Sequence, residues 1–493
     1  MSSVSNSLDR QMGLLGLAAT GICSMIGASI YVVPFMIQRS VPGIGPYVLP
    51  AFLFASIAAA LAAFSYIILA SAMPRAGGSY IYASRALNPY LGFVASFSQW
   101  FGLSIAIGVV SYVIIPFLRD IASILNFEHF AILLDKGSVR VLLALIILWS
   151  FVFVNIKGVK LYERTLIPLM VMMFGLGAIV IVAGLSFTQQ DFAQAILAKE
   201  GRTIEPASSV FSWSTFLSGS ALLFSSFIGF DSIAQAGGEA KDPSRSLPRA
   251  IGIAIVTVTL FYIAFTFALY HTVPWSFVAE QAMIKDVTAP GLLSYLLPSG
   301  WAVLIIFGAS VALLNDLPAM ILSVSRLMFS WAEDGIFPKR IAAIHADYHT
   351  PHIAIVVSGL MATIGILGSH FAGDFFLGID IMVTSMLVNY LLMCLSVLLL
   401  PLTNAAIAAK ITVFKSKLLQ RILALAGTLM LLVFLVIHII KDLTTPVAAW
   451  YFHSTPIWIF VMLIGSVIFY HHWRRLKNAG VNTTELFTTL PPE

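Results

Sequence analysis

The chain has 493 residues, of which 59% are hydrophobic and only 10% are charged. Soluble domains carry about 25% charged residues, so this composition excludes a soluble protein. The 27 Lys and Arg residues outnumber the 22 Asp and Glu residues. In a membrane protein such an excess gathers on cytoplasmic loops, so it does not indicate a nucleic-acid partner.

Apolar windows long enough to cross a lipid bilayer recur twelve times along the chain. About 20 apolar residues cross about 30 Å of hydrocarbon. Such windows begin near residues 14, 46, 91, 138, 163, 214, 248, 300, 353, 375, 420 and 455. We therefore expect an all-α integral membrane protein with twelve transmembrane helices.

The distribution of basic residues predicts the orientation of these helices. Of the 27 Lys and Arg residues, 18 fall on the side of the two termini and eight on the opposite side, with Arg326 near the end of the eighth span. This excess predicts that both termini, residues 1–13 and 476–493, are cytoplasmic. The first apolar run contains Gly and Pro without a small-residue cleavage pattern, so we expect no removable signal peptide.

The first and the sixth span are interrupted by glycines and small polar residues. The interruptions lie in GICSMIGASIYVVP at residues 21–34 and SSFIGFDSIAQAGGE at residues 225–239. Irregular backbone at membrane depth is tolerated where it lines a cavity. Two such breaks in corresponding positions of two halves indicate the substrate site of a transporter. Close helix packing through small residues is the alternative explanation.

Four sequence strings resemble, in the same order, those of the amino acid-polyamine-organocation (APC) permeases. They are IGASIYVVP, PRAGGSYIYASRALNPYLGFVASFSQW at residues 74–100, GFDSIAQAGGEAKDPSRSLPRAI at residues 229–251, and SRLMFSWAEDGIFPKRIAAIHADYHTP after the eighth span. The resemblance implies the LeuT-type fold, with inverted repeats at residues 14–187 and 214–400. An outer loop at residues 188–213 would join the repeats, and two peripheral helices at residues 420–475 would follow them.

The resemblance also implies the substrate contacts. A half-helix beginning near Gly27 would present backbone N–H groups to a carboxylate, and half-helices ending near Met25 and Ile228 would present carbonyl groups to an ammonium group. The expected carboxylate contacts are the backbones of Gly27, Ala28 and Ser29. The expected amine contacts are the carbonyl groups of Met25, Ser225 and Ile228, beside Gly229. Ser29 and Ser225 depart from the family pattern, which has a glycine and in some relatives an aromatic residue there.

Phe224 and Phe230 flank the second break, so we consider them as gates, whereas packing is the favoured role of Phe227. Two acids are candidates for coupling transport to an ion, because a charge at bilayer depth costs about 2.5 to 3.5 kcal/mol on insertion scales. Asp231 matches an acidic position of many relatives, where it would sense protons, hold the interrupted helix, or cap nearby N–H groups.

Asp316 lies near the centre of the eighth span, where the family pattern does not lead us to expect an acid. It would contact a cationic substrate, carry a proton, or pair with a polar neighbour such as Asn315. Arg326 matches a family arginine and is expected to be structural, reaching the membrane interface. The fifth span lacks the lysine that replaces a sodium ion in some relatives, so both a proton and sodium stay open as the coupling ion.

The expected function is therefore secondary transport of amino acids across the plasma membrane by alternating access, as symport or exchange. A polyamine or organocation carrier is the alternative, and a receptor that binds without transport is the alternative from another class. No nucleophile, base and metal set converges at one depth, so we expect no enzyme and no cofactor. His345, His349 and His352 lie on the loop after the eighth span, and we expect no metal site there.

Overall fold

A computed structural model describes residues 8–491, except residues 28, 206, 373–375 and 448. In this part of the chain the structure is helical, with two isolated β-bridges and no strand. Within the described residues, twelve helices or helix pairs are long and apolar enough to span a membrane, as predicted. In chain order they are α1 (Leu14–Met25) with α2 (Ser29–Ser40), α3 (Val48–Ala72), α5 (Pro89–Ile124), α7 (Gly137–Ile156), α8 (Val159–Ser186), α10 (Trp213–Phe224) with α11 (Ser232–Gln235), α12 (Pro243–Thr272), α15 (Ser299–Glu333), α16 (His352–Ala372), α17 (Phe376–Thr403), α19 (Lys417–Thr444) and α20 (Ser454–Asn478).

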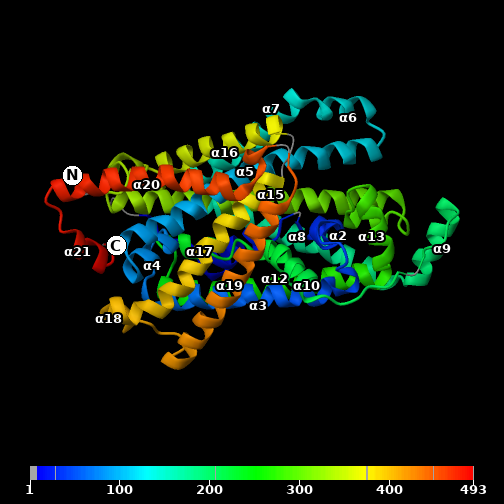
Figure 1. Ribbon diagram of the computed structural model, residues 1–493. Coiled ribbons are helices and arrows are strands. Elements are labelled where there is room, and N and C mark those ends of the chain that lie inside the picture. Colours follow the sequence, from blue (N-terminus) through cyan, green and yellow to red (C-terminus); the bar gives the residue numbers. More distant parts are fainter. Residues whose placement is uncertain (1–7, 28, 206, 373–375, 448, 492–493) are drawn as a thin grey trace.

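Shorter helices connect the spans. They are α4 (Gly78–Ala86), α6 (Glu128–Asp135), α9 (Gln189–Glu200), α13 (Trp275–Ile284), α14 (Ala289–Leu293), α18 (Ala405–Ala408) and α21 (Thr483–Thr488), with the 3-10 helices η1 (Gly45–Tyr47), η2 (Ser225–Phe227), η3 (Lys339–Ala342) and η4 (Trp450–Phe452). The helices α4, α18 and α21 lie at one end of the bundle, and α6, α9 and α13 lie at the opposite end (Figure 1).

The chain before the first span and the chain after the last span lie at the same end of the bundle. Met12 pairs with Ala240, and the neighbouring bridge joins Ala76 to Ala236. The side chain of Arg75 donates a hydrogen bond to the carbonyl of Pro491 at 3.0 Å. An even number of spans requires this arrangement, so the span count and the contacts agree.

The interrupted spans lie in the interior of the bundle. In the first span, 82% of the most apolar window is buried, whereas the corresponding share is 22% in α19 and 28% in α20. The long helices α5 and α15 pack against each other, and α1 and α8 pack against α15. Because neighbouring helices cover both breaks, their freed backbone groups face protein rather than lipid.

The segment expected as an outer loop, residues 188–213, contains the helix α9. Thr188 and Asp191 make a capping box at the start of this helix, and Gly201 ends it in the left-handed conformation, with φ of +67°. Both signals are local to the sequence and explain why a helix forms there.

Candidate functional site

The first break lies between Met25, where α1 ends, and Ser29, where α2 begins. Ile26 leaves helical geometry, with φ of −88° and ψ of 84°. The resemblance implied that the N–H of Gly27 is free to bind a carboxylate. In the structure this N–H donates a hydrogen bond to the carbonyl of Met25 at 3.1 Å. Ala28 lies outside the described residues. Ser29 is half-buried at the start of α2, and the predicted interruption of the span is confirmed.

The second break lies after Phe224, where α10 ends. The 3-10 helix η2 follows, Ile228 is extended, and α11 begins at Ser232. Gly229 has φ of +134°, which residues with a side chain rarely adopt. In the described part of the chain, the carbonyl of Ile228 accepts no hydrogen bond, whereas that of Ser225 accepts the N–H of Ile228 at 3.2 Å. Of these two predicted carbonyl groups, the one at Ile228 is therefore open.

The two breaks contact each other through their backbones. A Cβ atom added to Gly229 would overlap the carbonyl group of Ser24 and would lie 2.9 Å from the backbone nitrogen of Met25. The hydroxyl groups of Ser24 and Ser232 are also 3.0 Å apart, within hydrogen-bond distance. Glycine at position 229 therefore permits the close approach of the second break to Ser24 and Met25.

Tyr262 of α12 joins the two breaks. Its hydroxyl oxygen lies 2.6 Å from the carbonyl oxygen of Met25 and 3.0 Å from that of Ser226. Because a phenol has one proton, it donates fully to only one of these carbonyl groups at a time. The rings of Phe52 and Phe227 pack against it at centroid separations of 5.5 and 5.4 Å. Both half-helix ends thus present carbonyl oxygens around one point.

Nothing in the sequence distinguishes Tyr262 from its neighbours. It lies in the run TLFYIAFTF, in which it is one aromatic residue among four. Its partners are 237 and 36 residues away along the chain. The role of Tyr262 therefore follows only from the fold.

Asp316 of α15 faces the first break. A Cβ atom added to Gly27 would overlap Oδ2 of Asp316, so the carboxylate lies directly against Gly27. Asp316 is only 6% exposed, and its Oδ1 atom is buried without a hydrogen-bond partner. No Lys, Arg or His of the described residues pairs with it. The structure thus places a carboxylate without a charged partner at the break.

The pairing of Asp316 with Asn315 is not found among the described residues. The side-chain nitrogen of Asn315 donates instead to the sulfur of Cys23 at 2.9 Å. The side-chain oxygen of Asn315 is itself buried without a partner. Asn315 therefore ties α15 to α1 and leaves the carboxylate beside it uncompensated.

Asp231, in contrast, has several partners. It is completely buried and accepts hydrogen bonds from the hydroxyl of Tyr390 at 2.5 Å and from the side chain of Gln99. The Gln99 oxygen in turn accepts from Gln235 at 3.3 Å and from Asn389 at 3.2 Å. These residues connect α11 with α5 and α17. None of these donors is charged, so only hydrogen bonds from neutral groups stabilise the Asp231 carboxylate.

The network around Asp231 also reaches the second break. The N–H of Gly229 donates to the hydroxyl of Tyr390 at 3.3 Å, and it also interacts with the Asp231 carboxylate. Both the helix-holding and the capping interpretations of Asp231 agree with these contacts. Asp231 and Asp316 share no hydrogen-bond partner in the residues that the structure covers.

The aromatic residues considered as gates are packed in the interior. The ring of Phe230 stacks on that of Tyr390 with a centroid separation of 4.9 Å. Phe224 contacts Tyr390 and Phe434, with centroid separations of 6.1 and 5.7 Å. Their role as gates stays a prediction. Phe227, for which packing was favoured, packs against Phe52 and Tyr262.

Two buried ion pairs lie at the end of the bundle that holds the termini. Arg326 was expected to reach the membrane interface, but it is only 1% exposed. Its side chain pairs with Glu239, and its Nε atom lies 3.1 Å from the carboxylate. Arg85 of α4 makes two hydrogen bonds to Asp334, at 2.5 and 3.0 Å. These pairs connect the end of α15 to the segments after α11 and around α4.

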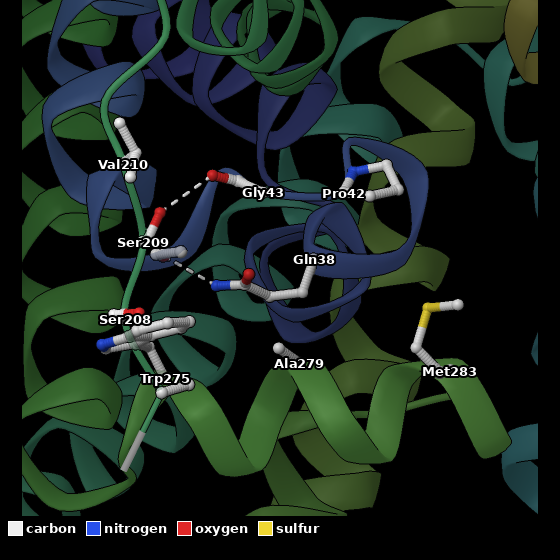
Figure 2. Close-up of a pocket in the computed structure, with 11 residues that line it drawn as sticks. Gln38, Pro42, Gly43, Ser208, Ser209, Val210, Trp275, Ala279 and Met283 are labelled. Carbon is white, nitrogen blue, oxygen red and sulfur yellow. Dashed lines mark hydrogen bonds between the residues drawn. The ribbon is translucent and has the colours of Figure 1, made fainter.

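A surface pocket of about 350 Å³ lies away from the breaks. It is formed by the end of α2, the segment 207–210 and α13 (Figure 2). Ser209 donates to the carbonyl of Gly43 at 3.1 Å, and Gln38 donates to that of Gly45 at 2.9 Å. Gln38 is the lining residue within α2, and the rise along α2 from Ser29 to Gln38 is about 14 Å at 1.5 Å per residue.

Two of the histidines after the eighth span lie close together. The rings of His345 and His352 have a centroid separation of 5.4 Å. No group of three or more His, Cys, Asp or Glu residues lies close enough to hold a metal ion in that part of the chain.

Comparisons with known proteins agree on one family. A family model described as amino acid permease matches residues 12–464. The methylthioribose transporter of Bacillus subtilis is 25% identical over 379 residues, which cover 74% of this chain and 76% of that protein. The cationic amino acid transporter 4 of Mus musculus is 27% identical over 385 residues, 74% of this chain and 56% of that protein. The branched-chain amino acid permease BcaP of Bacillus subtilis is 26% identical over 380 residues, 75% of this chain and 76% of that protein.

Proposed function

Because the chain belongs to the amino acid permease family, we propose that it moves amino acids across a membrane by alternating access. Membership of this family shows that the chain is a multi-pass membrane transporter with the LeuT-type fold and not an enzyme. The names of two of the relatives above state amino acids as cargo, and the name of the third states methylthioribose. The substrate, the mechanism and the coupling ion are our proposals.

The main support for the proposal is that the two helix breaks lie in contact with each other. The backbone of Gly229 lies against that of Ser24 and Met25, and the Tyr262 hydroxyl lies between the carbonyl groups of Met25 and Ser226. Half-helix C-terminal ends carry partial negative charge, which suits an ammonium group, and the start of α2 carries partial positive charge, which suits a carboxylate. An α-amino acid carries both groups on one carbon. The site residues are Met25, Gly27, Ala28, Ser29, Ser225, Ile228 and Gly229.

The buried ion pairs support alternating access. Arg85 with Asp334, and Arg326 with Glu239, join different segments at one end of the bundle. The opposite end carries the pocket at the end of α2. We take the structure as a conformation closed at the end that holds the termini, with the inverted repeats at residues 14–187 and 214–400 as the moving parts. Opening that end would require both ion pairs to separate.

The proposal also covers the coupling of transport to an ion and the orientation of the chain in the membrane. Asp231 and Asp316 are the candidate coupling residues, for a proton or for sodium, in symport or exchange. The excess of basic residues on the side of the two termini supports a cytoplasmic location of both termini, and we propose the plasma membrane as the location of the protein. The second candidate function is transport of amines. It is favoured by Asp316, whose carboxylate lies where the backbone was expected to bind a substrate carboxylate.

Net flux in proteoliposomes tests the proposed function. Labelled amino acids and amines are offered with and without a sodium gradient or a pH gradient, and protein-free liposomes serve as the control. The proposal expects uptake of at least one amino acid above that control. Saturable binding without uptake would indicate a receptor and would overturn the transport proposal.

A further inference from the structure

Asp316 has the surroundings of a binding residue rather than of a structural one. Its carboxylate lies against Gly27, its Oδ1 atom has no partner, and no charged group of the described chain compensates it. A buried acid in a membrane protein is almost always paired or lines a substrate path. Asp231 shows the contrast within the same chain, because Tyr390 and Gln99 both donate hydrogen bonds to it.

We propose that Asp316 binds a cationic group of the substrate, so that the transporter selects substrates with a net positive charge. This class contains amines without a carboxylate and amino acids with a basic side chain. The inference rests on the proposed function, since it assigns the substrate class of the same site. A zwitterion without further positive charge would bring its carboxylate toward Gly27 and would be repelled by Asp316.

The hydrogen-bond capacity of the site fits an ammonium group. Such a group has three N–H donors. Asp316 offers one oxygen without a partner. The carbonyl oxygens of Met25 and Ser226 have four lone pairs between them, of which the N–H of Gly27 occupies one on Met25 and the single proton of the Tyr262 hydroxyl occupies one more. Acceptors from α1, η2 and α15 are therefore available around the breaks.

The other two roles of Asp316 agree less well with these contacts. Among the described residues no permanent partner of Asp316 is found, since Asn315 donates to Cys23 instead. Protonation alone would remove the charge but would leave the buried Oδ1 atom without a partner. A cationic ligand supplies both the opposite charge and the missing donor.

Four probes separate charge from the presence of a carboxylate. L-Leucine is neutral overall and isoamylamine is its decarboxylated form, whereas L-arginine and agmatine form the same pair with a basic side chain. Dissociation constants are measured by ligand-induced thermal stabilisation of the full chain in detergent. We expect at least one of the three positively charged probes to bind at least tenfold more tightly than leucine.

The variants Asp316→Asn and Asp316→Glu test the residue itself. Asp316→Asn is expected to weaken binding of the preferred cationic probe at least tenfold and to leave the affinity for leucine unchanged or higher, because the repulsion of its carboxylate is removed, while Asp316→Glu restores part of the preference. The control is Asp120→Asn, which removes an exposed acid paired with Arg119 and is expected to bind all probes as the original chain does. The ratio of two affinities is measured within one variant, so it is independent of the folded yield.

Three results would overturn the inference. One is leucine bound as tightly as the three charged probes by the original chain. Another is an equal loss of all four affinities in Asp316→Asn. The third is an Asp316→Asn variant that keeps all four affinities but no longer responds when sodium chloride replaces choline chloride. This result would assign Asp316 to the binding of an inorganic cation. Net uptake of leucine in proteoliposomes would then still support the proposed function, whereas absence of uptake for every probe would contradict that function as well.

Discussion

The carboxylate of Asp316 lies directly against Gly27, in the gap where the first membrane span is interrupted. The two residues are separated by 289 positions in the sequence and come from different helices, α15 and the α1–α2 connection. Glycine leaves the space that the carboxylate occupies. A buried acid near the centre of α15 thus lies beside the interruption of the first span.

Gly27→Val is expected to weaken substrate binding at least tenfold, which is about 1.4 kcal/mol. The valine Cβ would overlap the Asp316 carboxylate and fill the space at the break. Binding of the substrate found in the flux assay is measured by thermal stabilisation, and delivery to the membrane by surface labelling. The control is Gly175→Val in α8, where an added Cβ meets no atom within 4 Å. Unchanged affinity in Gly27→Val would remove Gly27 from the site.

Gly229→Ala is expected to destabilise the whole protein. Its φ of +134° disfavours any side chain, and the added Cβ would overlap the Ser24 carbonyl group. Strain of this kind costs of order 1 to 3 kcal/mol. The melting temperature in detergent is compared with that of Gly252→Ala, in which the new Cβ meets no atom within 4 Å. Equal melting temperatures of the two variants would contradict the close approach of the breaks.

Tyr262→Phe is expected to lower substrate affinity by about fivefold. The variant loses the hydrogen bond from Tyr262 that holds the carbonyl groups of Met25 and Ser226 in place, and one hydrogen bond contributes about 1 kcal/mol. The ring that packs on Phe52 and Phe227 stays in place, so expression should not change. Tyr270→Phe on the same helix is the matched control, since its hydroxyl donates to the carbonyl of Pro34, at 2.7 Å, within α2. A larger loss in the control than in Tyr262→Phe would argue against the bridging role.

Asp334→Asn is expected to destabilise the protein by about 3 to 5 kcal/mol, because it leaves the buried Arg85 guanidinium without a counter-charge. Asp120→Asn removes an exposed partner of Arg119 and should cost at most about 1 kcal/mol. Thermal unfolding of the purified variants measures both effects. Similar losses in the two variants would show that the Arg85 pair does not hold this end of the bundle together.

The spans and the breaks were predictable because their signals are local. Twelve apolar windows follow from composition, and the glycines around residues 27 and 229 mark the interruptions directly. The helix α9 carries an equally local signal in Thr188, Asp191 and Gly201, within the segment expected as a loop.

The contacts across the bundle were not predictable, because they join residues far apart in sequence. Tyr262 with Met25, Asn315 with Cys23, and Arg326 with Glu239 follow no periodic pattern within one helix. The sequence identified Asp316 as unusual but left three roles open. Only the fold shows that its neighbour is Gly27 and that Asn315 bonds elsewhere.

A structure determined by electron cryo-microscopy with a transported substrate bound tests the central claim most directly. The account predicts density for the substrate between the two breaks, in contact with the carbonyl oxygens of Met25 and Ser226 and with the carboxylate of Asp316. Density only in the pocket beside Gln38 and Trp275, with the breaks closed on each other as here, would contradict it.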